Sequence, residues 1–183
     1  MKSVIISALS VILYVSACAQ EPEGAQQILA SGVKQAAAQN KNLFVMFHAS
    51  WCGWCHKMDD AMNDPSVASF FTDNYVIRHL VVLESKDKKK LENPGALELM
   101  NKYSEESSGI PFWIIFDKSG TAIADSREKL ADGSKGGNVG CPASEKEVAH
   151  FINVLRQTSS IKKDGLAIIQ SRFRKIETSA GQP

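Results

Sequence analysis

The chain has 183 residues, of which 44% are hydrophobic and 22% are charged, as expected for a globular protein with one well-formed core. Its formal net charge of +1 gives no reason to expect a nucleic acid as a partner. The one dense basic run, residues 86–90, has no aromatic residues interleaved with it, so we interpret it as a solvated loop.

The first 19 residues have the pattern of a signal peptide. A nearly continuous apolar segment, residues 4–15, follows a positive charge and is too short to cross a bilayer. Two cleavage patterns overlap: an A-x-A site at 17–19, and a bacterial lipobox at 15–18 that would leave Cys18 as a lipidated first residue. Both predict export, as a periplasmic protein or a membrane-anchored lipoprotein, to a compartment that permits disulfides. An ordinary buried N-terminal helix is the alternative.

Helices and strands alternate after this leader. Apolar residues at helical spacing predict a helix over residues 25–39, and the apolar run 43–47 predicts a strand buried on both faces. A helix over 54–62 follows. Aspartate and proline at 64–65 then predict the start of a short helical turn, before a second strand over 75–82.

The second half of the chain predicts a helix over 95–103, then strands over 111–116 and 121–125 joined by a tight turn. Residues 126–142 are polar and rich in glycine, so we predict a loop there.

Two helices are expected to end the chain. Ser144 and Glu147 form a capping box at the start of the first, and the second covers about 164–176. This order predicts an α/β fold with a mixed central sheet and helices on both faces. Strands separated by helices are expected to pair in parallel, and the last two to form an antiparallel hairpin. We place one domain over residues 24–158, and a C-terminal helical extension and tail over 159–183.

Cys52 and Cys55 lie between a predicted strand and a predicted helix, as a dithiol redox site requires. A cysteine attacks as its thiolate, and the N-terminus of a helix stabilises that thiolate. We therefore expect Cys52 to be the exposed nucleophile and Cys55 the buried thiol that resolves the mixed disulfide. His56 and Lys57 supply nearby positive charge.

The same residues also read C-x-x-C-H, the attachment pattern of a c-type haem. His56 would be one axial ligand, and Met58, Met62 or Met100 the other. Small cytochromes are mostly helical, however, and the three buried β-runs predicted here disfavour that interpretation.

A soft-metal site is a third interpretation of the motif. Cys52, Cys55 and His56 are suitable ligands for zinc or copper(I), and His48 and Cys141 would have to complete the set. Two cysteines and one adjacent histidine fall short of a closed structural zinc site.

The stretch FHASWCGWCHKM at residues 47–58, together with GIPFWIIF at 109–116, resembles the thioredoxin family. The similarity is greatest to exported members with a W-C-x-x-C-x-x-M motif, and it covers about residues 25–158. It implies a thioredoxin-like fold with an extra C-terminal helix, and a cis proline at Pro111 that faces the disulfide. The chain departs from the family at Met46, where ordinary thioredoxins carry a buried aspartate that accepts the proton of the second cysteine.

The resemblance implies a thiol-disulfide oxidoreductase that acts on protein disulfides in the cell envelope without a cofactor. Cys52 and Cys55 are the catalytic residues, and the residues expected to contact substrate are Trp51, Gly53, Trp54, Ile110 and Pro111. Its partners would be protein thiols and disulfides and an upstream redox protein, with membrane contact only through a lipid on Cys18. The alternative is a metal-binding chaperone or a peptide-binding module of the same fold without redox turnover.

Cys141 is the remaining cysteine of the exported chain. Unpaired cysteines mostly behave as small apolar residues, and no basic residue adjoins this one in sequence. We therefore expect Cys141 to pack in the core, with a third redox position as the alternative.

Overall fold

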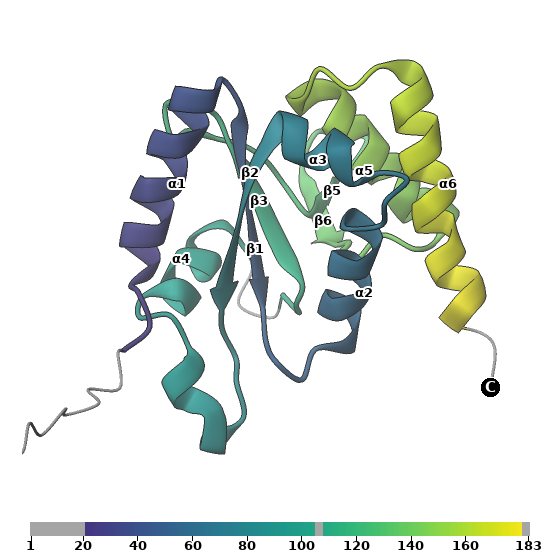
Figure 1. The fold of residues 1–183 in the computed structure, drawn as a ribbon. Coiled ribbons are helices and arrows are strands. Elements are labelled where there is room, and N and C mark those ends of the chain that lie inside the picture. Colours follow the sequence, from purple (N-terminus) through teal and green to yellow (C-terminus); the bar gives the residue numbers. More distant parts are fainter. Residues whose placement is uncertain (1–20, 105–107, 181–183) are drawn as a thin grey trace, which may run out of the picture.

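A computed structural model describes residues 21–104 and 108–180, so the predicted signal peptide and Cys18 lie outside the described residues. Its centre is a four-stranded mixed sheet in the order β2-β1-β3-β4 (Figure 1). β1 pairs in parallel with β2 and antiparallel with β3, and β3 pairs antiparallel with β4. The strands are β1 (Asn42–His48), β2 (Tyr75–Val81), β3 (Phe112–Phe116) and β4 (Ala122–Asp125).

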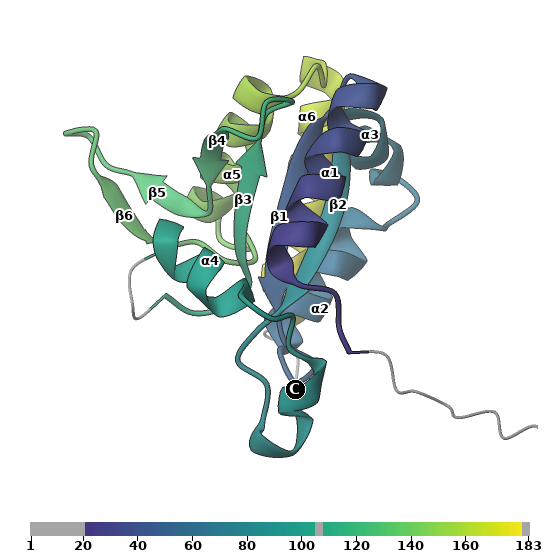
Figure 2. The same ribbon diagram turned by 90° about the vertical axis from the view of Figure 1, so that its left-hand side faces the viewer.

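Helices cover both faces of this sheet (Figures 1 and 2). One face carries α1 (Ala25–Gln39) and α4 (Ala96–Tyr103). The other face carries α2 (Gly53–Met62), α3 (Ala68–Asn74), α5 (Glu145–Thr158) and α6 (Lys163–Ala180). The expected α/β architecture with two covered faces is therefore confirmed. None of the helices in the described ranges is long and apolar enough to cross a membrane.

The central strand β1 is buried on both faces because its apolar side chains alternate between two cores. Phe44 and Met46 face the core beneath α2 and α5, whereas Leu43, Val45 and Phe47 face the core beneath α1 and α4. All five are at most 1% exposed. The continuous apolar run in the sequence reflects this double burial.

The expectation that strands separated by helices pair in parallel is wrong for β3. The helix between β2 and β3 is α4, whose eight residues extend only about 12 Å at 1.5 Å per residue. The seven residues of β2 extend about 23 Å, so α4 does not carry the chain back along the sheet. β3 therefore begins near the edge where β2 ends, and Phe112 pairs with Phe47 in the antiparallel direction.

Residues 126–142, predicted as a loop, contain a second, two-stranded sheet. β5 (Arg127–Lys129) pairs antiparallel with β6 (Lys135–Asn138), and this hairpin projects beyond α4 in Figure 2. Asp125, at the end of β4, holds its base through ion pairs with Arg127 and Lys135. Short strands with glycine and charge give no alternating apolar pattern, which is why the sequence did not indicate them.

Two smaller expectations also differ from the structure. α3 begins at Ala68 rather than at Pro65, because residues 64–67 form a turn in which Asp64 accepts hydrogen bonds from the backbone and hydroxyl of Ser66. The loop after β2 contains a 3-10 helix, η1 (Lys86–Leu91), with no buried residue.

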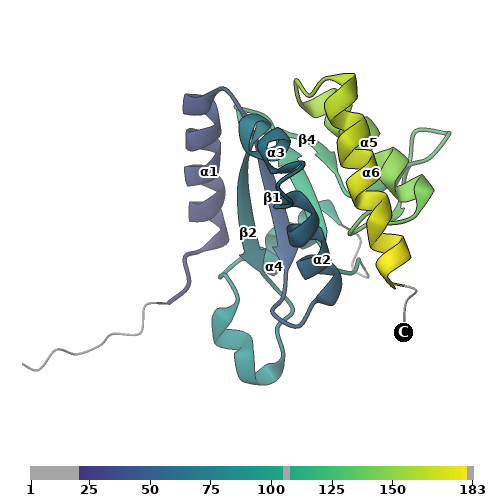
Figure 3. The same cartoon turned by 45° about the vertical axis from the view of Figure 1, so that its right-hand side comes forward.

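The last helix, α6, runs beside α5 and contacts α2 (Figure 3). Phe173 of α6 is fully buried and lies 5.0 Å from the ring of Phe151 on α5 and 6.3 Å from that of Phe71 on α3. An ion pair of 2.6 Å joins Arg172 to Asp64. The C-terminal helix therefore shares the core that supports α2.

Candidate active site

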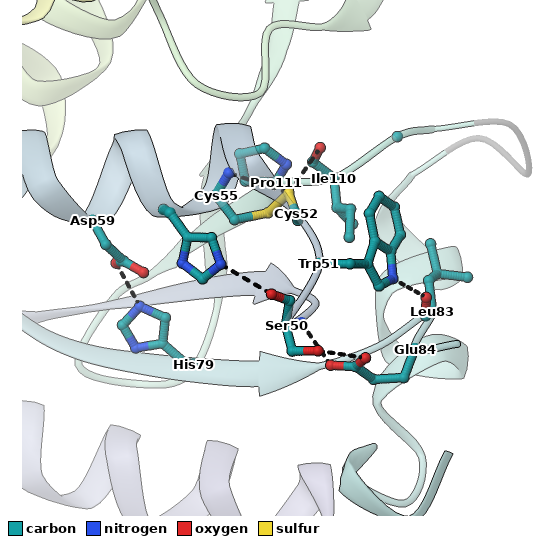
Figure 4. Close-up of a disulfide and its surroundings, with 12 residues drawn as sticks. Ser50, Trp51, Cys52, Cys55, Asp59, His79, Leu83, Glu84, Ile110 and Pro111 are labelled. Atoms are coloured by element: carbon teal, nitrogen blue, oxygen red, sulfur yellow. Dashed lines mark hydrogen bonds and ion pairs between the residues drawn. A yellow bond between two sulfur atoms is a disulfide. The ribbon is translucent and has the colours of Figure 1, made fainter. Parts of the chain in front are cut away.

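The N-terminus of α2 carries a disulfide between Cys52 and Cys55, with an S–S distance of 2.01 Å (Figure 4). Cys52 is the N-cap residue of α2, and the Cys55 backbone N–H donates a hydrogen bond of 3.1 Å to the Cys52 sulfur. When the bond is reduced, the same N–H and the helix dipole face the Cys52 sulfur and favour its thiolate. The site thus has the helix-terminal geometry that a nucleophilic cysteine needs.

Both sulfur-bearing residues are buried in this disulfide state. Cys55 is 0% exposed, and Cys52 is 3% exposed, which is less than the sequence had suggested. The cover over Cys52 is the segment before β3, because Ile110 packs on the disulfide and its carbonyl oxygen lies 3.7 Å from the Cys52 sulfur. Of the two cysteines, Cys52 is the slightly less buried one.

The segment that faces the disulfide is held by one side chain. The Ile110–Pro111 peptide bond is cis, as the resemblance implied. The Asn138 amide at the end of β6 donates hydrogen bonds to the carbonyls of Gly109 (2.7 Å) and Pro111 (3.1 Å). Its oxygen accepts from Gly140 N–H and from the Ser126 hydroxyl.

A groove of about 270 Å³ runs along this segment beside the disulfide. It is lined by Trp54, Ile110, Pro111, Asn138, Cys141 and Glu147, among others. Trp51 and Trp54 are 58% and 46% exposed, although large apolar side chains are usually buried. Gly53 is also exposed, with no atom within 4 Å of the position that a Cβ would take. Of the five residues expected to contact substrate, Trp51, Gly53 and Trp54 are therefore exposed. Ile110 is half-buried and Pro111 is buried, although both line the groove.

A buried carboxylate holds the other side of the motif. Glu84 follows β2 and is only 4% exposed. It accepts hydrogen bonds from the backbone N–H (2.6 Å) and the hydroxyl (2.9 Å) of Ser50, and the Trp51 indole N–H donates to the Leu83 carbonyl (2.8 Å) (Figure 4). Burial raises the pKa of Glu84, but the Ser50 hydrogen bonds lower it more, so the carboxyl pKa lies below its usual value.

The two basic residues after the motif have partners of their own. The His56 Nε2 atom lies 3.0 Å from the Ser50 carbonyl oxygen, and the Lys57 ammonium lies 4.4 Å from the centre of the Trp54 ring. These contacts position the backbone before Cys52 and the exposed indole after it.

Met46 is 1% exposed and packs in the α2 core, where it pairs across the sheet with His79 on β2. The His79 Nε2 atom lies 2.8 Å from a carboxylate oxygen of Asp59 on α2, and the His48 ring packs edge-on against His79 at 5.2 Å. The face of the sheet beneath α2 therefore carries polar side chains, but they stand at His48 and His79 and not at the position of Met46.

Cys141 is a free thiol, 6% exposed, in the core beneath α2 and at the floor of the groove. Burial, and secondarily the negative charge of Glu147, raise the pKa of its thiol to about 12. Among the residues that the structure describes, no group of three or more His, Cys, Asp and Glu side chains is placed to hold a metal ion.

Sequence reasoning missed Ser50, Glu84 and Asn138. Their contacts join positions that are far apart in the chain, for example 34 residues for Ser50 and Glu84. The one available signal was the acidic residue Glu84, two positions after the strand predicted over 75–82.

The model of the thioredoxin-like family matches residues 25–118, about half of the chain. Together with the sheet order, the cysteine pair and the cis proline, this match shows that the chain belongs to the thioredoxin-like family. The fold and the C-x-x-C disulfide expected from the sequence are confirmed.

Solved structures with this fold include a disulphide isomerase from Xylella fastidiosa Temecula1, at 16% identity and a TM-score of 0.48, covering 92% of this chain and 98% of that one. Two others are the DsbH oxidoreductase, at 17% identity and a TM-score of 0.42 (86% and 96% covered), and the oxidised C-terminal domain of DsbD from Neisseria meningitidis, at 16% and 0.44 (75% and 98%). No curated protein matches the chain.

Proposed function

We propose that this protein is a thiol-disulfide oxidoreductase that acts on protein disulfides in the cell envelope. The observation that carries the proposal is the placement of Cys52 as the N-cap of α2, with the Cys55 N–H directed at its sulfur. That placement favours a Cys52 thiolate, which is the attacking species in disulfide exchange.

The reaction has two balanced steps. The Cys52 thiolate attacks one sulfur of the substrate disulfide, a mixed disulfide forms, and the other substrate sulfur leaves as a thiolate. The Cys55 thiolate then attacks the Cys52 sulfur and releases the second substrate thiolate. The substrate gains two electrons and the Cys52–Cys55 pair loses them; the reverse sequence oxidises a substrate dithiol. An upstream redox partner protein restores the starting state.

The substrate chain is proposed to lie in the groove along Ile110 and Pro111. The exposed ring of Trp54 lines the groove, and so does Ile110, which packs on the disulfide. Trp51, directly before Cys52, is a second exposed indole. Gly53 leaves space between the cysteines for the approach of a second backbone. This arrangement would serve a peptide-binding module without redox turnover equally well, so the decisive evidence is covalent exchange.

The location is proposed from the sequence. Residues 1–19 are taken as the signal peptide, Cys18 as the site of lipidation if the lipobox is used, residues 24–158 as the catalytic domain and 159–183 as its C-terminal extension. Mass spectrometry of the mature protein would show acyl chains on Cys18 or a free N-terminus at Gln20.

The test is substrate trapping. Cys55→Ser should accumulate mixed disulfides with envelope proteins, because attack proceeds while resolution fails. Cys52→Ser should trap few or none, and Cys141→Ser is the matched control that should trap none. The wild type should also reduce insulin. Equal trapping by the Cys52 and Cys55 variants would reverse the assigned order, and no trapping by either variant would favour the binding module.

A further inference from the structure

The loop between β2 and α4 extends beyond the sheet at the end where α2 begins (Figures 1 and 2). Its 3-10 helix, η1, has no buried residue, so core packing does not explain why the chain makes this excursion. Hydrogen bonds nevertheless close the base of the loop. The Glu84 N–H donates to Glu92 at 2.7 Å, and the Val81 N–H donates to the Asn93 side chain at 2.7 Å. The loop is therefore held as a projection although it buries nothing.

This loop contacts the residues directly before the disulfide. Leu83, at its start, has a φ of 55°, a backbone conformation that is uncommon for leucine and that proteins hold mostly at functional sites. The Leu83 carbonyl accepts the indole N–H of Trp51 (Figure 4). The Lys88 ammonium lies 3.4 Å from the Ser50 hydroxyl oxygen. Because Ser50 and Trp51 precede Cys52, a molecule that docks on this loop lies beside the reactive sulfur.

The loop also concentrates positive charge. Residues 86–90 contain four lysines and one aspartate, a net charge of +3, in a chain whose formal net charge is only +1. Among the residues that the structure describes, the side chains of Lys86 and Lys90 have no hydrogen-bond or ion-pair partner. At a rise of about 2 Å per residue they lie about 8 Å apart along η1, about one Debye length at physiological ionic strength. The lysines therefore act on an approaching molecule as one patch.

The carboxylates around the loop do not cancel this charge at its surface. Glu84 is buried and accepts hydrogen bonds from Ser50. Glu92 is half-buried and is paired with Lys89 at 2.7 Å. Asp87 is the one exposed carboxylate in residues 84–92. The surface of the loop is therefore dominated by its three other lysines.

The position of the loop favours a protein over a membrane as its partner. Trp51 directly precedes Cys52, so a bilayer bound to the loop would lie against the disulfide and hinder protein substrates. An acidic protein segment can instead contact the lysines while a neighbouring cysteine of the same protein reaches Cys52. Trp51 and Leu91, which are 58% and 42% exposed, offer apolar contacts beside the charges.

We propose that the lysines of residues 86–90 and the Trp51 indole form a docking surface for an acidic segment of the protein that exchanges disulfides with Cys52. This inference rests on the proposed function and adds the charge of the partner. Attraction between the lysines and the partner's carboxylates speeds encounter, and salt weakens that attraction. The bonds that form and break at Cys52 are those of the exchange reaction itself.

The test measures attack by Cys52 on peptides that differ only in charge. Three peptides of equal length carry one cysteine as a mixed disulfide with thionitrobenzoate, flanked by glutamates, glutamines or lysines. The reduced full chain carries Cys18→Ser and Cys55→Ser, so Cys52 and the buried Cys141 are its only thiols. The Cys52 thiolate bonds to the peptide sulfur, and one coloured thionitrobenzoate leaves. The ratio of the second-order rate constants for the glutamate and glutamine peptides reports docking separately from the reactivity of Cys52.

The parent chain should attack the glutamate peptide about tenfold faster than the glutamine peptide at about 0.01 M salt. The ratio should approach one at about 1 M salt, and the lysine peptide should be the slowest at low salt. Lys86→Gln, Lys88→Gln and Lys90→Gln together should lower the ratio at low salt to about twofold or less.

The matched control replaces three other exposed lysines and changes the net charge equally. Lys34→Gln lies on α1, and Lys162→Gln and Lys163→Gln lie at the start of α6, which is at the opposite end of the molecule from the start of α2 (Figure 1). This triple variant should keep the ratio of the parent chain.

A parent ratio near one at low salt, or an equal fall in both triple variants, would overturn the docking surface. So would a loop variant that keeps the parent ratio but sediments less than the control with vesicles of phosphatidylcholine and phosphatidylglycerol, since the lysines would then serve a membrane. The proposed function is tested separately with both active-site cysteines present. Failure of that chain to reduce insulin would overturn the function itself, whereas insulin reduction with a ratio near one would overturn only the docking surface.

Discussion

Two segments hold the backbone on either side of the Cys52–Cys55 disulfide, and they use different chemistry. On one side, the Glu84 carboxylate accepts two hydrogen bonds from Ser50, two residues before Cys52. On the other side, the Asn138 amide donates to two carbonyls of the 109–111 segment and accepts from Gly140 N–H. One support is a charged acceptor, and the other is a neutral group that both donates and accepts.

The difference follows from what each segment presents. Ser50 offers only donors to Glu84, so a carboxylate satisfies them with charge-assisted hydrogen bonds. The segment before β3 offers two carbonyls that need donors, which a carboxylate cannot supply. The hydrogen bonds of Glu84 are therefore expected to depend on the ionisation of its carboxyl group. Those of the Asn138 amide, which does not ionise, are expected to be independent of pH.

Replacing the Asn138 amide with a carboxylate should have the largest effect on the free energy of unfolding. Asn138→Asp keeps the shape of the side chain, but it removes both donors and places a negative charge beside the Gly109 and Pro111 carbonyls. We expect a loss of about 3 kcal/mol in the free energy of unfolding, measured with denaturant, because two acceptors lose their partners. Insulin reduction should fall as well, since the segment borders the groove.

The control for this exchange is Asn153→Asp on the exposed surface of α5, which should change the free energy of unfolding by less than about 0.5 kcal/mol. Asn138→Asp with stability and activity like those of the control would show that the amide does not hold the segment.

Removing the charge on the Glu84 side should have a smaller effect that depends on pH. Glu84→Gln keeps an acceptor for Ser50 N–H but loses the charge assistance, so we expect a loss of about 1.5 kcal/mol in the free energy of unfolding near neutral pH. The folded-state pKa of Glu84 is lowered from its usual value of 4.5. The stabilisation is therefore fully present above 4.5 and is lost as the pH falls through the folded pKa.

Denaturant unfolding of wild type and Glu84→Gln, from neutral pH to well below 4.5, measures this loss. The difference in the free energy of unfolding between wild type and Glu84→Gln should shrink toward zero in acid. The corresponding difference between wild type and Asn138→Ala should stay nearly constant with pH. Glu98→Gln, at an exposed site on α4, is the control. A Glu84→Gln difference that is independent of pH would contradict the assigned role of the carboxylate.

Local patterns predicted the parts of the site that local sequence determines. The apolar run of β1 and the adjacent C-x-x-C motif placed Cys52 at the start of α2. The cis bond before Pro111 was expected only from the resemblance to the thioredoxin family. Helix caps such as Ser144 with Glu147 were also predictable, because both residues of the capping box lie within one turn.

The remaining features depend on how distant segments meet. The direction of β3 follows from the length of α4 relative to β2, which residue patterns alone do not reveal. Glu84 and Asn138 appear in the sequence as ordinary polar residues, and only the folded sheet places them against Ser50 and Gly109. Sequence patterns therefore identified Cys52 and Cys55 but not the Glu84 carboxylate and the Asn138 amide that hold the backbone on either side of them.

Cys141 provides the smallest expected effect, on the Asn138 side of the comparison. It lines the same groove as Pro111, yet its thiol is buried and has a pKa raised to about 12, so it is almost entirely protonated and a poor nucleophile near neutral pH. Cys141→Ser should leave disulfide exchange within about twofold of wild type, roughly 0.4 kcal/mol in the barrier. Cys141→Ala is the companion variant, because it separates loss of the sulfur from burial of a hydroxyl.

Peptide mapping of the oxidised protein should find Cys141 free and Cys52 joined to Cys55. A bridge between Cys141 and either active-site cysteine, or a large loss of exchange in both variants, would instead make this side of the groove part of the redox chemistry.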